Sequence, residues 1–240
     1  MARILMLLWC VFIGCAAQAA GYGAEDARAR TTPPGRADTL ENLVAYLVES
    51  YRDDEQKARV LLAWIVHHVD YDQYKAGEIE KRSKSAMRPD RTADTGDAFE
   101  TRVGVCGDIA DLYRRMVALA GMEGAVVTGY AGDHVTARNK EQHRHVWNAV
   151  KIKGKWELVD PTWAMGRARV FQNVRGRTAH ESAIQNRMRN AHRTEKTRRG
   201  RSVDDAWFMT KPSRMIRTHY PDEERWQLLP VPKSPGAFLK

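Results

Sequence analysis

The sequence predicts an α+β fold in which a group of helices precedes an antiparallel sheet. Apolar residues recur at helical spacing between residues 38 and 120, and short β-branched runs follow between residues 125 and 159. The 240 residues are 43% hydrophobic and 29% charged, a composition typical of a chain with one buried core and not of a disordered one. Helices followed by strands favour an α+β fold over a doubly wound parallel one.

Two helices are expected at the start of the folded part. The first begins at Asp38, with Glu41 three residues later as in a capping box. Its apolar residues repeat every three or four positions: Leu40, Leu43, Val44 and Leu47. The second helix begins near Asp54 and ends around Val69-Asp70-Tyr71-Asp72. Residues 73–99 are mostly polar and show no clean period, so we expect a long surface loop there.

A third helix begins close to Cys106, and Gly121 is placed to end it. Short apolar or alternating segments then predict three strands, at residues 125–130, 146–152 and 156–159. Lys153-Gly154-Lys155 separates the last two, which indicates a hairpin.

The first 19 residues have the features of a signal peptide. Arg3 provides a positive start, Ile4–Ile13 is uncharged, and Ala17-Gln18-Ala19 is a small-x-small cleavage site. The apolar run is shorter than the roughly 20 residues that span a bilayer, although a retained membrane anchor is an alternative. We therefore expect an exported protein, periplasmic or extracellular.

The signal changes the cysteine count. Cys10 lies inside it, and Phe12-Ile13-Gly14-Cys15 approximates a lipoprotein box, so lipidation at Cys15 is the expected route to any membrane attachment. Cys106 is then the one free thiol of the mature chain. Such a thiol is either buried and inert or reactive.

Composition divides the mature chain further. Residues 20–37 are small, polar and charged and predict a linker, and residues 38–235 form the domain. A basic insert at about 164–203 has eleven Lys and Arg against Glu181 and Glu195, which equals the whole formal excess of +9. It would attract an anionic cell-envelope polymer, the alternative being a solvated loop. No nucleic acid is expected, because we recognise no module that reads it.

Three residues carry the candidate chemistry. Cys106 lies at the predicted start of a helix, where free N–H groups and the helix dipole favour the nucleophilic thiolate. A two-residue hairpin turn would pair Ile152 with Lys155, which places His145 and Asp160 diagonally on one face, roughly 7–8 Å apart. Asp160 would then hold the ring of His145 while the other ring nitrogen faces Cys106.

The competing interpretations are weaker. His143 and His145 form a His-x-His pair, but no further cluster has familiar ligand spacing, so we expect no metal and no cofactor. Asn148 either orients the site or is a solvated strand residue. The tryptophans of this region are expected in the core or in a cleft wall: Trp147, Trp156 and Trp163.

Three stretches resemble the blocks of the transglutaminase-like superfamily: Thr101–Asp108, His145–Ile152 and Trp156–Trp163. Ala206-Trp207-Phe208 and His219-Tyr220-Pro221 resemble the C-terminal part of its kyphoscoliosis-peptidase-like branch. The likeness covers roughly residues 38–163 and 203–235.

The resemblance implies a papain-like core with a Cys-His-Asp triad. Cys106 would be the nucleophile, His145 the general base and then acid, and Asp160 the orienting carboxylate. The backbone N–H of Cys106 is one candidate oxyanion donor, and Trp64 and Tyr71 are candidates for a second, aromatic one.

The same resemblance implies a thiol enzyme that acts on amide bonds of proteins or peptides through a thioester. Hydrolysis by a protease or amidase is favoured over amine crosslinking, because the sequence shows neither an EF-hand-like calcium loop nor a second domain to present an amine. The alternative is a non-catalytic module of the same fold that binds a peptide or the cell envelope.

Overall fold

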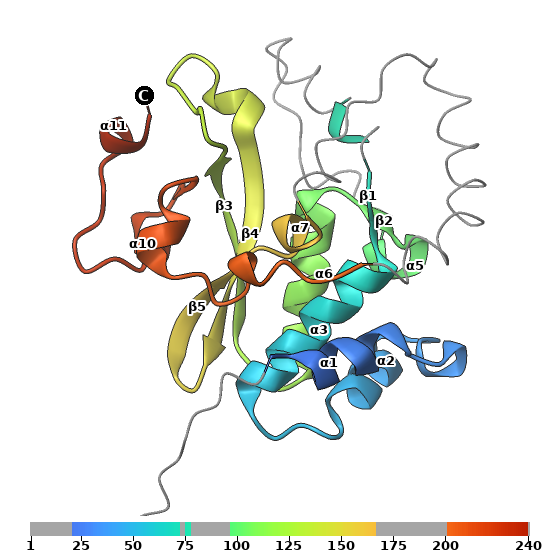
Figure 1. Ribbon diagram of the computed structural model, residues 1–240. Helices are drawn as coiled ribbons and strands as arrows, with labels where there is room; N and C mark the ends of the chain where they lie inside the picture. The colour runs from blue at the N-terminus through green and yellow to red at the C-terminus, as the bar shows by residue number, and fades with distance from the viewer. Residues whose placement is uncertain (1–20, 73–74, 78–96, 167–200, 240) are drawn as a thin grey trace, which may run out of the picture.

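The computed structural model of the chain describes residues 21–72, 75–77, 97–166 and 201–239. The expected signal peptide, with Cys10 and Cys15, lies outside these residues, as does most of the basic insert. Helices pack on one side of a four-stranded antiparallel sheet, and the C-terminal segment lies on its other side (Figure 1). The predicted α+β class is therefore confirmed. Within the described ranges, no helix has the length and apolar character needed to cross a membrane.

Two long helices form the centre of the helical layer. α3 (Asp54–His68) is buried over ten consecutive residues from Ala58, which is typical of a helix surrounded by other elements. α6 (Cys106–Leu119) ends as predicted at Gly121, whose φ of +79° lets the N–H of Met122 bond the carbonyl of Val117. The N-terminus of α6 is the end that carries Cys106.

Two boundaries differ from the expected ones. α2 (Leu40–Val48) begins one residue later than predicted, because Thr39 and not Asp38 accepts the N–H of Asn42. The expected surface loop ends earlier, since α5 (Ala98–Thr101) buries Phe99 against Trp64. Residues 73–74 and 78–96 of that loop lie outside the described residues.

The expected linker contains a helix, α1 (Gly23–Arg30), which packs along α3; the linker prediction is wrong there. Its acidic residues suggest solvent contact, but they have partners on α3. Glu25 is buried and accepts a bond from Gln56, and both oxygens of Asp26 accept bonds of 2.8 Å from Arg59. A short 3₁₀ turn, η1 (Pro34–Arg36), then leads to α2.

Arg59 joins three separate segments through its guanidinium. It is 2% exposed, lies over the ring of Tyr22, and binds Asp26 of α1 and Asp205 of η3 (Asp205–Trp207). Arg59→Ala is expected to lower the free energy of unfolding by about 3 kcal/mol, because carboxylates lose a buried partner. Urea denaturation measures the change. Arg114→Ala, which removes an exposed pair, is the control and should cost at most about 0.5 kcal/mol; equal losses would contradict the role of Arg59.

The sheet has the strand order β5-β4-β3-β6. Its antiparallel strands have these bounds: β3 Gly124–Ala131, β4 Arg144–Ile152, β5 Lys155–Val159 and β6 His219–Pro221. Lys153 and Gly154 both have positive φ, as a two-residue type I′ turn requires. Ile152 therefore pairs with Lys155, and the predicted register is confirmed.

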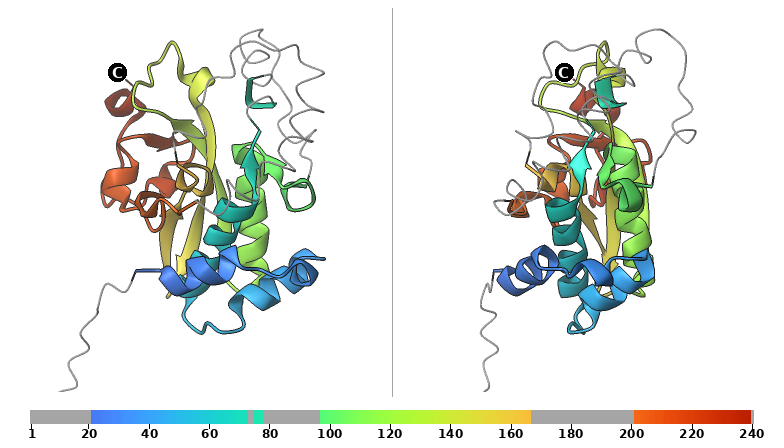
Figure 2. Two further views of the ribbon diagram at one scale, coloured as in Figure 1. Left: turned by 45° about the vertical axis from the view of Figure 1, so that its right-hand side comes forward. Right: turned by 90° about the vertical axis from the view of Figure 1, so that its right-hand side faces the viewer.

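Several further short elements follow β3 along the chain. They are η2 Lys140–His143, α7 Pro161–Ala164, α10 Pro212–Met215, η4 Glu224–Gln227 and α11 Pro235–Phe238. Helices α10 and α11 lie on the far side of the sheet from α6 in both rotated views (Figure 2). Ala164 and Val203, the expected ends of the basic insert, are buried in the core. These two residues therefore belong to the domain and not to the insert.

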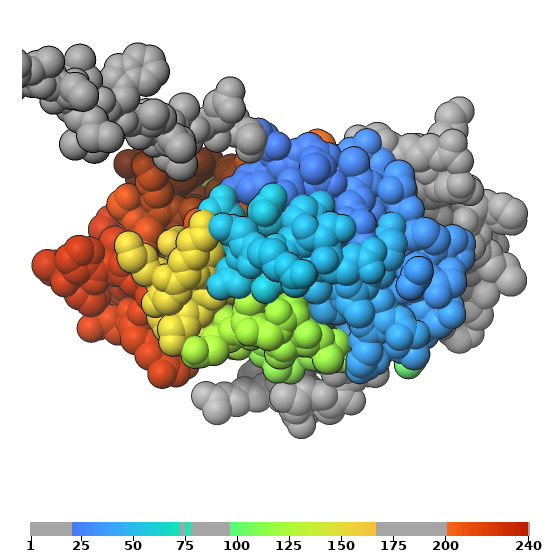
Figure 3. All heavy atoms as spheres, turned by 90° about the horizontal axis from the view of Figure 1, so that it is seen from below, coloured from blue at the N-terminus to red at the C-terminus, as the bar shows by residue number. Residues whose placement is uncertain are grey.

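The end of the molecule opposite Cys106 is closed by side chains. Seen from below, the start of α3, the end of α6 and the β4–β5 hairpin lie side by side on one surface (Figure 3). Lys153 of the hairpin pairs with Asp53 at 2.7 Å, and Lys151 pairs with Glu123 at 2.8 Å. These ion pairs hold the hairpin in place at one end of β4, and His145 lies at the other.

Candidate active site

Cys106 is the first residue of α6 and is half-buried. The residue before it, Val105, is extended, and its N–H donates to the carboxylate of Asp108 at 3.0 Å. This bond closes the first turn of the helix, and Lys75 pairs with the same carboxylate at 3.1 Å. The lysine offsets a negative charge that would otherwise oppose ionisation of the nearby thiol. Cys106 thus lies at a helix start, as predicted, and such a position favours a thiolate.

His145 lies near the start of β4, and Asp160 follows β5 as the N-cap of α7. Both are buried, and Nε2 of His145 donates to Oδ2 of Asp160 at 2.7 Å. The expected hydrogen bond between these residues is therefore present. The other carboxylate oxygen, Oδ1, accepts the N–H of Trp163 at 2.9 Å, so both oxygens of Asp160 are held.

The charges of this pair are coupled. Burial alone would raise the pKa of Asp160, but the charges and hydrogen bonds of His145 and His219 outweigh it and hold that pKa well below its usual range. Burial would likewise lower the pKa of His145, yet the carboxylate and a side-chain hydrogen bond with Cys106 raise it to about 10. Since Nε2 faces Asp160, Nδ1 is the ring nitrogen left for Cys106. The geometry suits a thiolate beside an imidazolium.

A second histidine contacts the same carboxylate, and sequence reasoning did not assign it to the site. His219 is fully buried, and its Nε2 lies 3.0 Å from Oδ2 of Asp160. The residue belongs to β6, which pairs with β3. No spacing links it to the triad, since 59 residues separate it from Asp160; the one signal was the His219-Tyr220-Pro221 stretch of the family resemblance.

Of the two aromatic candidates for the second oxyanion donor, Tyr71 lies near Cys106 and Trp64 packs in the core. Tyr71 lies in β1 (Asp70–Tyr71), which pairs in parallel with β2 (Val103–Gly104) just before Cys106. Burial, followed by the charges of Cys106 and Asp160, raises the pKa of Tyr71 well above its usual value, so its hydroxyl stays a donor. Trp64 instead stacks on His68 in the core, with a centroid distance of 5.0 Å.

Two other sequence hypotheses are resolved by burial and position. Asn148 is completely buried and donates to the carbonyls of Ala110 in α6 and Ala125 in β3, so its interpretation as a solvated residue is wrong. It fixes the helix that carries Cys106 against the sheet. His143, the candidate partner of His145 in a His-x-His pair, lies in η2 and is half-buried outside the cluster.

Among the described residues, one group could offer three metal ligands: His145, Asp160 and His219, with ligand atoms within 4.8 Å of one another. These atoms already bond one another, because Oδ2 accepts from both imidazoles. The arrangement is that of a hydrogen-bonded acid–base group.

Comparison with known proteins identifies a family. Residues 41–161 match the family model described as Transglutaminase-like superfamily. Kyphoscoliosis peptidase of Homo sapiens is 29% identical over 202 residues, covering 83% of this chain and 26% of that protein. Hillarin of Drosophila melanogaster is 28% identical over 200 residues, covering 81% and 21%. The chain thus spans about a quarter of the length of these relatives.

Solved structures give weaker similarities. The periplasmic domain of TgpA from Pseudomonas aeruginosa matches with a TM-score of 0.41 and 20% identity, covering 62% of this chain and 50% of that one. The family match includes Cys106, His145 and Asp160, and the kyphoscoliosis peptidase match confirms the predicted branch. The chain is a member of the transglutaminase-like superfamily.

Proposed function

We propose that this chain is an exported thiol enzyme that hydrolyses amide bonds of proteins or peptides. The observation that carries the proposal is the hydrogen-bonded series from Cys106 through His145 to the buried carboxylate of Asp160. An imidazolium held between a thiol and a carboxylate both stabilises a thiolate and supplies a proton, which are the two needs of acyl transfer.

In the first step, the Cys106 thiolate attacks the amide carbonyl carbon and a tetrahedral oxyanion forms. The backbone N–H of Cys106 and the hydroxyl of Tyr71 are its candidate donors. When the C–N bond breaks, the imidazolium of His145 gives its proton to the departing amine, which leaves a thioester. In the second step, neutral His145 takes a proton from water, which attacks the thioester and releases a carboxylic acid and the thiolate.

Hydrolysis is preferred over transfer to an amine, and the name peptidase of the relatives in human and mouse supports this choice. Incubating a protein substrate with a fluorescent primary amine separates the two reactions. New peptide termini support hydrolysis, whereas a fluorescent product indicates transfer. The alternative function, a binding module whose basic insert contacts an anionic envelope polymer, predicts neither product.

The thiolate itself is tested by the rate at which iodoacetamide alkylates Cys106 between pH 4 and 10. Because the pKa of His145 is raised to about 10, its positive charge persists through neutral pH and keeps the thiolate ionised well below the ordinary thiol pKa of ~8.5. His145→Ala should slow alkylation at pH 7 by roughly thirtyfold, since a free thiol is only a few per cent ionised there.

His143→Ala is the matched control, because it removes a neighbouring imidazole that lies outside the cluster. Its alkylation profile should equal that of the unmodified protein. An ordinary thiol profile that is indifferent to His145 would refute the enzyme and favour the binding module.

A further inference from the structure

His219 occupies an aromatic cage that the proposed reaction does not use. Its ring contacts three tryptophans at centroid distances of 4.3 to 5.3 Å: Trp147 of β4, Trp163 of α7 and Trp207 of η3. The side chain is fully buried, so contact with a substrate is excluded. A buried polar ring in apolar surroundings needs hydrogen-bond partners, and its nitrogens have them.

The two ring nitrogens face different partners. Nε2 lies 3.0 Å from Oδ2 of Asp160, and Nδ1 lies 2.9 Å from the hydroxyl oxygen of Thr218. Since an ionised carboxylate only accepts, Nε2 must carry a proton. The Thr218 hydroxyl, which also lies 3.5 Å from the carbonyl oxygen of Met215, can donate to Nδ1 of a neutral ring or accept from Nδ1–H of a charged one. In either case the proton on Nε2 points to Asp160.

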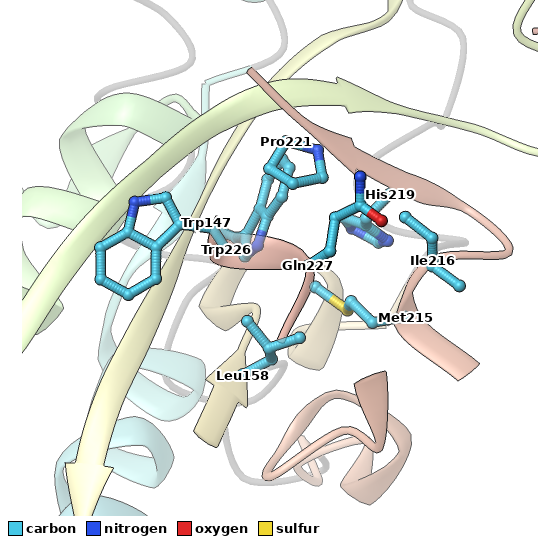
Figure 4. A pocket seen from close by; sticks show the side chains of 8 residues that line it. All are labelled: Trp147, Leu158, Met215, Ile216, His219, Pro221, Trp226 and Gln227. Atoms are coloured by element: carbon cyan, nitrogen blue, oxygen red, sulfur yellow. The ribbon is translucent and has the colours of Figure 1, made fainter. Parts of the chain in front are cut away.

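The pairing of β6 with β3 depends on a glycine of β3. Gly129 pairs with both His145 and Pro221. A Cβ at Gly129 would lie 2.2 Å from the carbonyl oxygen of Tyr220 and 2.7 Å from the ring of Trp147. Only glycine leaves room for this approach. His219 also lines a small pocket with side chains of the sheet and of the C-terminal segment, among them Trp147, Met215 and Gln227 (Figure 4).

We propose that His219 is a positioning residue, whose Nε2–H holds the buried carboxylate of Asp160 in place toward His145. The inference deepens the proposed function and rests on it. Asp160 is completely buried, and without His219 its Oδ2 would keep one donor, His145, the group that must move protons. The third donor to the carboxylate, the N–H of Trp163, binds Oδ1 and cannot replace it.

The test is the pH profile of Cys106 alkylation by iodoacetamide in four variants of the full chain: His219→Leu, His219→Gln, His67→Leu and His145→Ala. Leucine fills the cage but cannot donate a hydrogen bond. The alkylation profile of His219→Leu should therefore shift to higher pH by about one unit, the effect expected from one lost hydrogen bond to a charged group. Glutamine places an amide donor near the position of Nε2 and should restore most of the shift.

His67→Leu is the matched control. His67 is as buried as His219, and neither of its ring nitrogens has a hydrogen-bond partner in the described structure. Its replacement should leave the profile unchanged, which separates a positioning role from a general effect of altering the core.

The outcomes distinguish the two proposals. If His145→Ala abolishes the low-pH thiolate but His219→Leu keeps the original profile, the role of His219 is overturned and the enzyme stands. If His145→Ala changes nothing, the proposed function itself fails. Should the leucine variant not fold, His219→Met gives the decision: its flexible side chain fills the cage without a donor to Asp160, so a shift to higher pH supports the role and an unchanged profile refutes it.

Discussion

Replacement of Cys106 by alanine is expected to abolish turnover, with a fall of about 10⁴-fold or more in the rate of amide hydrolysis. No other group can form the thioester, since the described structure contains this one cysteine beside His145. Peptide cleavage followed by mass spectrometry measures the loss. The fold should persist, because Cys106 is half-buried at the first position of α6, where alanine is well tolerated.

Cys106→Ser tests the same point with a side chain of similar shape. A serine hydroxyl is far less acidic than a thiol, so the neighbouring imidazolium cannot keep it ionised and the variant should also be inactive. Unchanged far-UV circular dichroism in both variants would show that the fold is retained. Full activity in either variant would identify a different nucleophile and remove Cys106 from the mechanism.

Asp160→Asn should have the second largest effect, a fall of about 10³- to 10⁴-fold in kcat/KM. The carboxylate accepts three donors, and an amide has one oxygen and two N–H groups. The NH₂ group of the asparagine must therefore point at a donor, either the N–H of Trp163 or the N–H of an imidazole, and that contact is repulsive. His145 also loses the charge that raises its pKa to about 10, so the imidazolium no longer survives at neutral pH.

Kinetics across pH 5–10 and urea denaturation check both parts of this prediction. Asp222→Asn is the control, because Asp222 pairs with Arg144 next to His145 in the sequence but is partly exposed and outside the site. It should leave kcat/KM within about twofold. A loss of activity as large as that of Asp160→Asn would indicate that β4 is sensitive to any charge change, and not that Asp160 has a special role.

The parts of the site that the sequence could predict are those fixed by local rules. Gly154 and Lys153 define a two-residue turn, and the turn sets the register that brings His145 to Asp160. Cys106 lies at a helix start that its apolar period and Gly121 bracket. These features depend on residues close together in the chain, so a pattern of single residues can show them.

What the sequence could not show depends on partners that are remote in the chain. His219 enters the site because β6 pairs with β3, and nothing near His219 specifies that pairing. Helix α1 is similar: its charges suggest a solvated segment until Arg59, 33 residues from Asp26, is seen to neutralise them. The exchange of Asp38 for Thr39 as the N-cap is a smaller error, between two residues that both cap helices well.

The position of β6 in the sequence also determines the order in which the residues of the site are synthesised. A ribosome makes Cys106, His145 and Asp160 first, and His219 with Trp207 follows only after the insert has been synthesised. A nascent chain that stops short of β6 holds the nucleophile and its base but lacks the cage that fixes the carboxylate. If His219 positions the carboxylate as proposed, full thiol reactivity is expected only after β6 has been synthesised and has paired with β3.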